Sequence, residues 1–211
     1  MRIFVAGGSG VIGIRLLPLL LADGHVVAAM TRSAEKAGAL RAAGAEPVVS
    51  DVFDAPAMHA AVAGFAPDAV VNELTDLPDD PEHISATAQR NIRMRREGTG
   101  NLLAATVALP GARRRFVVQS VAWELPGEAA VAAADQERAV LDFGGVVLRY
   151  GQFYGPGTYW ETEVPPPPRI HIDEAARRTV AALDAKPPAV IEDVEPDAAQ
   201  ARRRLKSWTR R

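Results

Sequence analysis

The chain has 211 residues, of which 48% are hydrophobic and 24% are charged, and its formal net charge is −2 at pH 7. This length is sufficient for one well-buried domain, and the composition is that of an ordinary globular protein. The near-neutral charge argues against a nucleic-acid partner, and we interpret the arginine clusters at residues 113–115 and 202–204 as solvated surface. The chain contains no cysteine, which excludes disulfides, thiolate metal sites and cysteine nucleophiles.

Targeting and metal-binding signals are weak in this sequence. No secretory leader is recognisable before the first apolar run, and the apolar stretch 16–22, which contains Pro18, is too short to span a bilayer. We therefore expect a cytoplasmic protein without membrane contact. The four histidines have no spacing typical of zinc ligands, so no metal site is predicted.

Apolar runs typical of buried strands alternate with helix-like segments through most of the chain. The expected strands are residues 2–6, 25–30, 47–52, 69–74, 115–121 and 146–150. The expected helices are residues 11–22, a segment from the N-cap Ser33 to near Gly44, and residues 56–63, 85–108 and 128–142. This alternation predicts an α/β fold with a doubly wound, Rossmann-like parallel sheet and helices on both of its faces.

The alternating pattern weakens after Gly157. Four consecutive prolines at 165–168 indicate a stiff extended segment rather than a packed element. The elements expected beyond them are a helix at 173–185, a short strand at 189–194 and a terminal helix at 196–208. We therefore divide the chain into a dinucleotide-binding domain, 1–157, and a short lid with C-terminal elements, 158–211, packed on the same domain.

The most specific local feature is the glycine-spaced turn after the first expected strand, where Gly7, Gly10 and Gly13 stand three residues apart. The first glycine permits backbone angles that a Cβ would block, the second lets the main chain approach a pyrophosphate, and the third lets the helix pack tightly. The helix N-terminus then offers free N–H groups and a partial positive charge to phosphates. The predicted cofactor-binding residues of this turn are Gly7, Ser9, Gly10, Val11, Ile12 and Gly13.

The end of the second expected strand bears on the choice of cofactor. In NAD-binding folds of this type an acidic residue there binds the ribose hydroxyls, but this chain has Arg32 followed by Ser33. A guanidinium pairs with a phosphate in two-point geometry. The sequence therefore predicts that NADP(H) is preferred over NAD(H), with Arg32 and Ser33 beside the 2′-phosphate.

Two more strand ends supply candidate cofactor contacts. Asp51 can accept a hydrogen bond from the adenine amino group while Val52 packs on the ring, or Asp51 can instead cap the following turn. Leu74 ends the fourth expected strand beside the glycine turn, where backbone and small side chains would line the ribose. Glu73, which precedes it, is a further candidate proton donor, or alternatively a solvated acid at the strand end.

Further segments extend this pattern along the chain, at residues 6–13, 51–54, 67–72, 91–101, 115–120, 147–157 and 171–176. Together they resemble, over nearly the whole chain, an extended short-chain dehydrogenase/reductase of the NAD-dependent epimerase/dehydratase group. The resemblance implies a nicotinamide cofactor and a small-molecule substrate. It also implies a homodimer through the helices 85–108 and 128–142, although their apolar residues could equally face the sheet.

The chain also departs from that family, in which a serine or threonine, a tyrosine and a lysine four residues after the tyrosine carry the chemistry. No Tyr-x-x-x-Lys sequence occurs here. Val121 stands where the catalytic hydroxyl is expected, and a register set by Glu137 puts Ala129 and Ala133 at the tyrosine and lysine positions. The resemblance therefore implies an atypical member that lacks the usual Ser-Tyr-Lys residues. Its substrate lobe is much reduced, because only residues 158–170 remain of that region.

Hydride transfer needs a cofactor and a positioned carbonyl, whereas the proton can come from water or substrate. We therefore hypothesise an NADPH-dependent ketoreductase of a small organic secondary metabolite, for example a polycyclic one. The catalytic residues are unknown; the candidate proton donors are Ser120 and Tyr154, with Tyr150 beside them and Gln152 as a polarising amide. Each of these side chains could instead pack or form a structural hydrogen bond. The aromatic residues Trp123, Tyr159 and Trp160 could stack on a flat substrate or close the domain edge. The alternative hypothesis is a non-catalytic NADP-binding sensor or scaffold protein.

Overall fold

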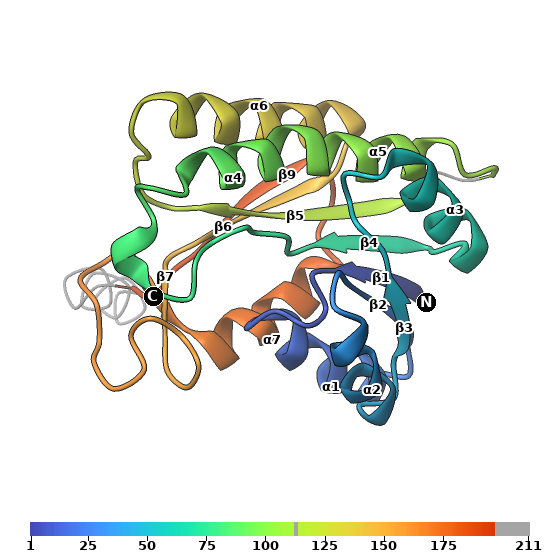
Figure 1. The fold of residues 1–211 in the computed structure, drawn as a ribbon, viewed down its shortest axis with the longest axis horizontal. Helices are drawn as coiled ribbons and strands as arrows, with labels where there is room; N and C mark the ends of the chain where they lie inside the picture. The colour runs from blue at the N-terminus through green and yellow to red at the C-terminus, as the bar shows by residue number, and fades with distance from the viewer. Residues whose placement is uncertain (112–113, 197–211) are drawn as a thin grey trace, which may run out of the picture.

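The computed structural model describes residues 1–111 and 114–196. Within these residues a seven-stranded sheet forms the centre of the molecule, and every neighbouring pair of its strands is parallel (Figure 1). In spatial order the strands are β3 (Glu46–Val49), β2 (Val26–Thr31), β1 (Arg2–Ala6), β4 (Ala69–Asn72), β5 (Arg115–Val121), β6 (Val146–Tyr150) and β9 (Ala189–Asp193). The predicted doubly wound α/β fold is confirmed.

Helices cover both faces of this sheet (Figure 1). The helices are α1 (Gly13–Ala22), α2 (Ala37–Ala42), α3 (Ala55–Phe65), α4 (Ala88–Arg93), α5 (Thr99–Val107), α6 (Gly127–Phe143) and α7 (Ile172–Ala182). Figure 1 draws α1, α2 and α7 on one side and α4, α5 and α6 on the other. Because strand side chains alternate between faces, Ile3 and Val5 join the core under α1, whereas Phe4 and Ala6 join the opposite core.

Two strands end earlier than the sequence predicts, and in both cases a polar side chain captures the backbone. Asp51 Oδ1 accepts a hydrogen bond from the N–H of Phe53 at 3.0 Å, so the chain turns after β3 instead of continuing to residue 52. Asn72 Oδ1 accepts from the N–H of Leu74 at 3.1 Å, which ends β4. Such local bonds compete with the sheet ladder for the same donors.

The long helix predicted at 85–108 begins only at Ala88 and is not uniform. A short turn of 3₁₀ helix (Pro81–His83) precedes α4, and a π-helical segment (Met94–Gly98) separates α4 from α5. At this widened turn Gly98 lies against its neighbours so closely that a Cβ would be 2.9 Å from Met94 Sδ. π-helical turns of this kind are often found at functional sites.

The segment after β2 also differs from its prediction. Ser33 stands before a short 3₁₀ turn (Ala34–Lys36), but its side chain makes no capping hydrogen bond, and α2 begins only at Ala37. The Ser33 N–H instead donates to Thr31 Oγ1 at 3.2 Å. Ser33 therefore stands at an N-cap position, as predicted, but that position begins a 3₁₀ turn and its side chain forms no capping bond.

The C-terminal segment is built into the main fold. Strand β9 pairs with β6 at the sheet edge, and α7 packs against α1. Between β6 and α7 in the chain, β7 (Gln152–Tyr154) and β8 (Arg169–His171) form a separate two-stranded parallel sheet. The terminal helix predicted at 196–208 lies outside the described residues, except for residue 196. No helix in the described part of the chain is long and apolar enough to cross a membrane.

Candidate functional site

The glycine turn joins β1 to α1 at the carboxyl ends of the central strands. Gly7 has a φ of +85°, a conformation that favours glycine. The Gly8 N–H donates to the carbonyl of Met30 in β2 at 2.9 Å, and the Gly10 N–H donates to the carbonyl of Gly7 at 2.9 Å. The first bond holds the turn against β2, and the second closes the turn on itself.

Close backbone approaches explain why this turn needs glycine. A Cβ on Gly7 would lie 2.9 Å from the carbonyl oxygen of Glu73, and a Cβ on Gly13 would lie only 2.2 Å from that of Gly7. Beyond them, the N–H groups of Val11 and Ile12 have no acceptor among the described residues. Unsatisfied donors at a helix N-terminus attract anions, so the turn fits the pyrophosphate of a dinucleotide.

The end of β2 is tied to the glycine turn by hydroxyl groups. Ser9 Oγ donates to Thr31 Oγ1 at 2.8 Å, and the Ser33 N–H reaches the same oxygen. Arg32 follows Thr31, and its half-exposed guanidinium lies 3.4 Å from Asp76 Oδ1. Arg90 Nη2 lies 2.6 Å from that same carboxylate oxygen. Neither Asp76 nor Arg90 belongs to a recognisable motif, so the sequence alone gives no signal for this pairing.

The other predicted cofactor residues have clear structural roles. Asp51 caps the turn after β3, and an adenine contact for it stays a prediction. Val52 is only 1% exposed, and its side chain packs against Met94 and Gly98 in the core, which leaves little surface for an adenine ring. Leu74 is half-buried, and its carbonyl accepts from Gln119 Nε2 at 3.1 Å, which ties the loop after β4 to β5.

Ser120, one predicted proton donor, belongs to a buried ionic network. It is 1% exposed, and its hydroxyl donates to Glu137 Oε1 at 2.6 Å. Arg149 donates to both oxygens of the same carboxylate, at 3.0 and 2.5 Å. Burial alone would raise the pKa of Glu137, but the hydrogen bonds from Arg149 and Ser120 hold it below its usual range. The Ser120 proton is thus committed to an ionised carboxylate.

Tyr154, the other predicted donor, lies in the small β7–β8 sheet. Its hydroxyl donates to Glu195 Oε1 at 2.6 Å, and its ring contacts His171 edge-to-face with ring centroids 5.1 Å apart. The bond to Glu195, together with burial, raises the pKa of Tyr154. The structure therefore places Ser120 and Tyr154 in separate hydrogen-bond networks, each ending on a carboxylate.

Glu73 is not the solvated acid that the sequence suggests. It is 6% exposed, and the Tyr150 hydroxyl donates to its Oε1 at 3.0 Å. The Tyr150 oxygen also lies 2.6 Å from Thr179 Oγ1. Burial raises the pKa of Glu73 to about 8; the Tyr150 hydrogen bond opposes this shift, and the charge of Asp193 adds to it. Glu73 is therefore mostly protonated, and neutral, at pH 7.

A second buried acid completes this cluster from α7 and β9. Asp193 Oδ1 accepts from Arg178 Nη1 at 3.1 Å, whereas its buried Oδ2 has no hydrogen-bond partner among the described residues. Burial raises the pKa of Asp193 to about 6, although Arg178 lowers it. Sequence spacing gives no signal for this cluster, because Glu73 and Tyr150 are 77 residues apart and only the strand order brings them together.

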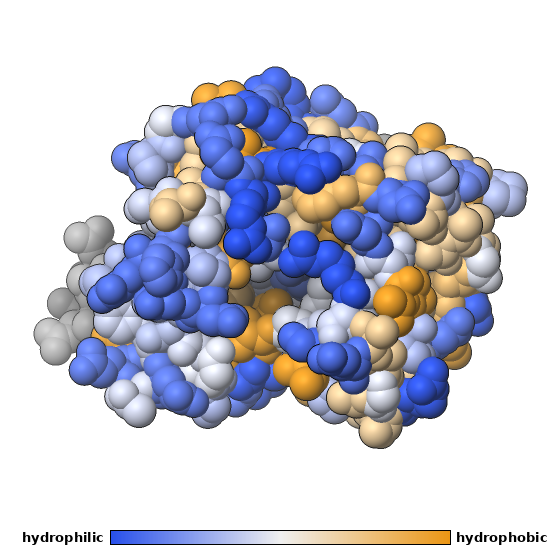
Figure 2. Space-filling view, in the orientation of Figure 1, coloured by the Kyte–Doolittle hydropathy of each residue, from blue (hydrophilic) through white to orange (hydrophobic). Residues whose placement is uncertain are grey.

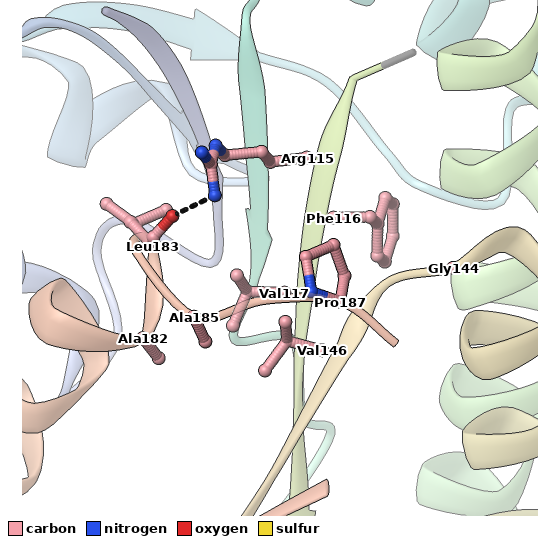
Figure 3. Close-up of a pocket in the computed structure, with 9 residues that line it drawn as sticks. All are labelled: Arg115, Phe116, Val117, Gly144, Val146, Ala182, Leu183, Ala185 and Pro187. Atoms are coloured by element: carbon pink, nitrogen blue, oxygen red, sulfur yellow. Dashed lines mark hydrogen bonds between the residues drawn. The ribbon is translucent and has the colours of Figure 1, made fainter. Parts of the chain in front are cut away.

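The molecule has two hollows in different places. Figure 2 shows a hollow near the middle of the drawn face, in the region between α4 and α7, with both hydrophobic and hydrophilic residues around it. A second, mostly apolar hollow lies at the amino ends of β5 and β6, where Arg115 Nη1 donates to the carbonyl of Leu183 at 2.6 Å (Figure 3). Ligands of open α/β sheets bind at the carboxyl ends of the strands, so the glycine turn marks the candidate site.

No cluster of potential metal ligands occurs in the described ranges.

A parallel sheet of this order, with a glycine turn after its first strand, defines the class of Rossmann-like nucleotide-binding proteins. Residues 7–141 match the protein family described as NAD(P)H-binding. The chain belongs to this NAD(P)H-binding family.

Two reductases are among its relatives. A Streptomyces protein named 3-diazoavenalumate denitrifying reductase is 33% identical over 256 residues, which include 100% of this chain and 81% of the relative. That aligned length exceeds the 211 residues of this chain, so the relative has residues within the aligned region that this chain lacks. A Stigmatella aurantiaca protein named 4-hydroxy-2-methyl-3-oxo-4-farnesyl-3,4-dihydroquinoline-1-oxide ketoreductase is 41% identical over 64 residues, 30% of this chain and 19% of the relative. The homology supports an NAD(P)H-dependent reductase in general terms.

Solved structures confirm the fold. UDP-glucose 4-epimerase from Thermotoga maritima, with UDP-glucose, has a TM-score of 0.74 at 18% identity and aligns over 99% of this chain and 82% of its own. The Thermus thermophilus UDP-glucose 4-epimerase in complex with NAD also has a TM-score of 0.74 at 18% identity, over 93% of this chain and 78% of its own. At this identity the likeness concerns the fold alone.

The glycine turn makes a first prediction. Gly13→Ala should lower the free energy of unfolding by about 2 kcal/mol, because the new Cβ meets backbone that cannot give way. The matched control Gly100→Ala lies in a helix with open space around it and should raise stability by about 0.5–1 kcal/mol. Urea unfolding of both variants checks this, and equal effects would contradict the packing argument.

The buried acid makes a second prediction. Between pH 4.5 and about 8 the folded state keeps a proton on Glu73 that the unfolded chain has lost, so the free energy of unfolding should fall as pH rises through this window. The contribution is about 1 kcal/mol per pH unit. Glu73→Gln cannot ionise and should remove this slope. Urea unfolding across the window measures it.

The control for this pH series is Glu35→Gln, which removes an exposed carboxylate and should keep the wild-type profile. Subtracting the wild-type curve from the Glu73→Gln curve cancels the other titrating groups. A flat difference curve would show that Glu73 is ionised throughout the window.

Proposed function

We propose that the protein is an NADPH-dependent reductase that delivers a hydride to a small organic substrate. The observation that carries this proposal is the glycine turn, whose close backbone contacts leave the N–H groups of Val11 and Ile12 without acceptors among the described residues. Membership of the NAD(P)H-binding family agrees with it. The nicotinamide cofactor, when bound, supplies the hydride.

The chain's own residues would bind and orient this cofactor. The N–H groups of Val11 and Ile12 would hold the pyrophosphate, and the guanidinium of Arg32 would hold the 2′-phosphate that distinguishes NADP from NAD. Asp51 would accept from the adenine amino group, while Leu74 would line the ribose. Within this proposal residues 1–157 form the dinucleotide-binding domain, and residues 158–211 form a short lid with C-terminal elements packed on the same domain.

The source of the proton that completes the reduction limits which substrate classes the protein can reduce. The hydroxyls of Ser120 and Tyr154 donate to carboxylates, that of Tyr150 donates to the mostly protonated Glu73, and the chain has no Tyr-x-x-x-Lys pair. Reduction of a ketone leaves an alkoxide that must take a proton, here from water. The loss of a positioned general acid typically costs on the order of 10²–10⁴-fold in rate. These residues therefore permit reduction of a carbonyl substrate but provide no positioned general acid for it.

A second substrate class follows from the Streptomyces relative, whose name describes a denitrifying reductase of a diazo compound. In an arenediazonium the hydride adds to the carbon that bears nitrogen, the C–N bond breaks, and N₂ leaves with its electron pair. The products are the arene, N₂ and the oxidised cofactor, and no proton is consumed. The committed hydroxyls therefore favour this class over a ketone. Tyr159 and Trp123, both partly exposed aromatic residues, suit a flat aromatic ring.

The test is a substrate comparison with NADPH that carries deuterium at the transferred position. We expect N₂ release from an arenediazonium, with deuterium at the carbon that lost nitrogen, faster than in a protein-free mixture. Gly13→Ala should abolish the excess rate. Deuterated alcohol from ketones, without reaction of the diazonium, would instead support the ketoreductase.

Calorimetric titration with NADPH and NADH separates the remaining possibilities. Tight NADPH binding without turnover on either substrate class would favour the sensor hypothesis. Failure to bind either cofactor would overturn the proposal itself, because the glycine turn would then have only a structural role.

A further inference from the structure

Two arginines from different elements meet on one carboxylate at the edge of the candidate site. Arg32 follows β2 and Arg90 belongs to α4, yet their Nη2 atoms lie 3.4 and 2.6 Å from the same oxygen, Asp76 Oδ1. The Asp76 side chain is only 10% exposed, whereas those of Arg32 and Arg90 are 50% and 56% exposed. The buried Asp76 carboxylate is thus covered by two guanidinium groups that are themselves exposed to solvent.

This arrangement is that of an anion site filled by the chain's own carboxylate. Two guanidinium groups repel each other, and an anion between them offsets that repulsion. Each guanidinium has five N–H donors, and the single oxygen of Asp76 engages only one nitrogen of each. A phosphate carries more charge and three oxygens, so it can satisfy more of these donors than one carboxylate oxygen does.

The loop that carries Asp76 is also anchored elsewhere. The Asp76 N–H donates to Asn91 Oδ1 at 3.3 Å, and the Tyr159 hydroxyl donates to the carbonyl of Pro78. At the other end of the loop, the Leu74 carbonyl accepts from Gln119. The loop therefore keeps its place when the Asp76 carboxylate releases the arginines, which is what a competing anion requires.

We propose that Arg90 is a second binding residue for the 2′-phosphate of NADP(H), and that the Asp76 carboxylate competes with that phosphate for Arg32 and Arg90. The inference rests on the proposed function, in which Arg32 alone was assigned to this phosphate. The choice between NADP(H) and NAD(H) then depends on Arg32 after β2, on Arg90 in α4 and on the Asp76 carboxylate between them.

The experiment is calorimetric titration of the full chain with NADPH, NADH, 2′,5′-ADP and 5′-AMP. Arg90→Ala should raise the Kd of NADPH and of 2′,5′-ADP about tenfold, since a charge-assisted contact is lost. The Kd of NADH and of 5′-AMP should stay within about twofold. Arg90→Lys, which keeps the charge, should recover part of the loss. The control Arg138→Ala removes an exposed arginine of α6 and should change neither cofactor's Kd.

Asp76→Asn gives the opposite expectation, because it removes the competing charge while keeping the size of the side chain. It should lower the Kd of NADPH about threefold or more and leave that of NADH unchanged. If Asp76→Asn weakened NADPH binding, the carboxylate would be a positioning group, which overturns the competition. If Arg90→Ala weakened NADPH and NADH equally, or neither, the assignment of Arg90 would be overturned.

The wild-type titration separates a failure of the proposed NADPH dependence from a failure of the role of Arg90. A wild-type protein that binds neither cofactor, or prefers NADH, refutes the proposed NADPH dependence and with it this inference. A wild-type preference for NADPH that Arg90→Ala leaves intact refutes only the role of Arg90. Thermal unfolding of each variant confirms that it is folded before titration.

Discussion

The contact between α1 and the glycine turn is the constraint on which the rest of this site depends. A Cβ on Gly13 would lie 2.2 Å from the Gly7 carbonyl, so only glycine lets the helix begin directly on the end of β1. At the start of this helix the N–H groups of Val11 and Ile12 have no acceptor among the described residues. The close backbone contact thus sets the geometry of the anion-binding turn.

Charge is distributed around this turn in a consistent way. Outside it, Arg32 and Arg90 add positive charge to the partial charge of the α1 N-terminus, with Asp76 between them. Beneath it, Glu73 has a pKa of about 8, so the acid whose backbone touches Gly7 carries little charge at pH 7. An ionised Glu73 would oppose a bound phosphate; a neutral one leaves the field of the helix and the arginines intact.

The sequence predicts the strand bounds well where an apolar run borders a turn marked by glycine. The expected bounds of β5 and β6 coincide with the observed ones, because Gly144 and Gly145 mark the turn before β6 without ambiguity. Strands β3 and β4 were expected to be longer, since hydrophobicity alone does not reveal that Asp51 and Asn72 capture the N–H two residues ahead. Local side-chain competition with the ladder is weakly encoded, whereas strand identity and order are strongly encoded.

The candidate site is less predictable, because its side chains are paired across the fold. The Ser120 and Tyr154 hydroxyls look available in the sequence, yet their acceptors, Glu137 and Glu195, stand 17 and 41 residues further along. A hydroxyl that donates to a carboxylate keeps its proton more firmly, so its presence near a cofactor does not make it an acid catalyst. Under the proposed function, the commitment of these hydroxyls would favour a substrate that releases N₂ when it accepts hydride, because that reaction needs no proton donor.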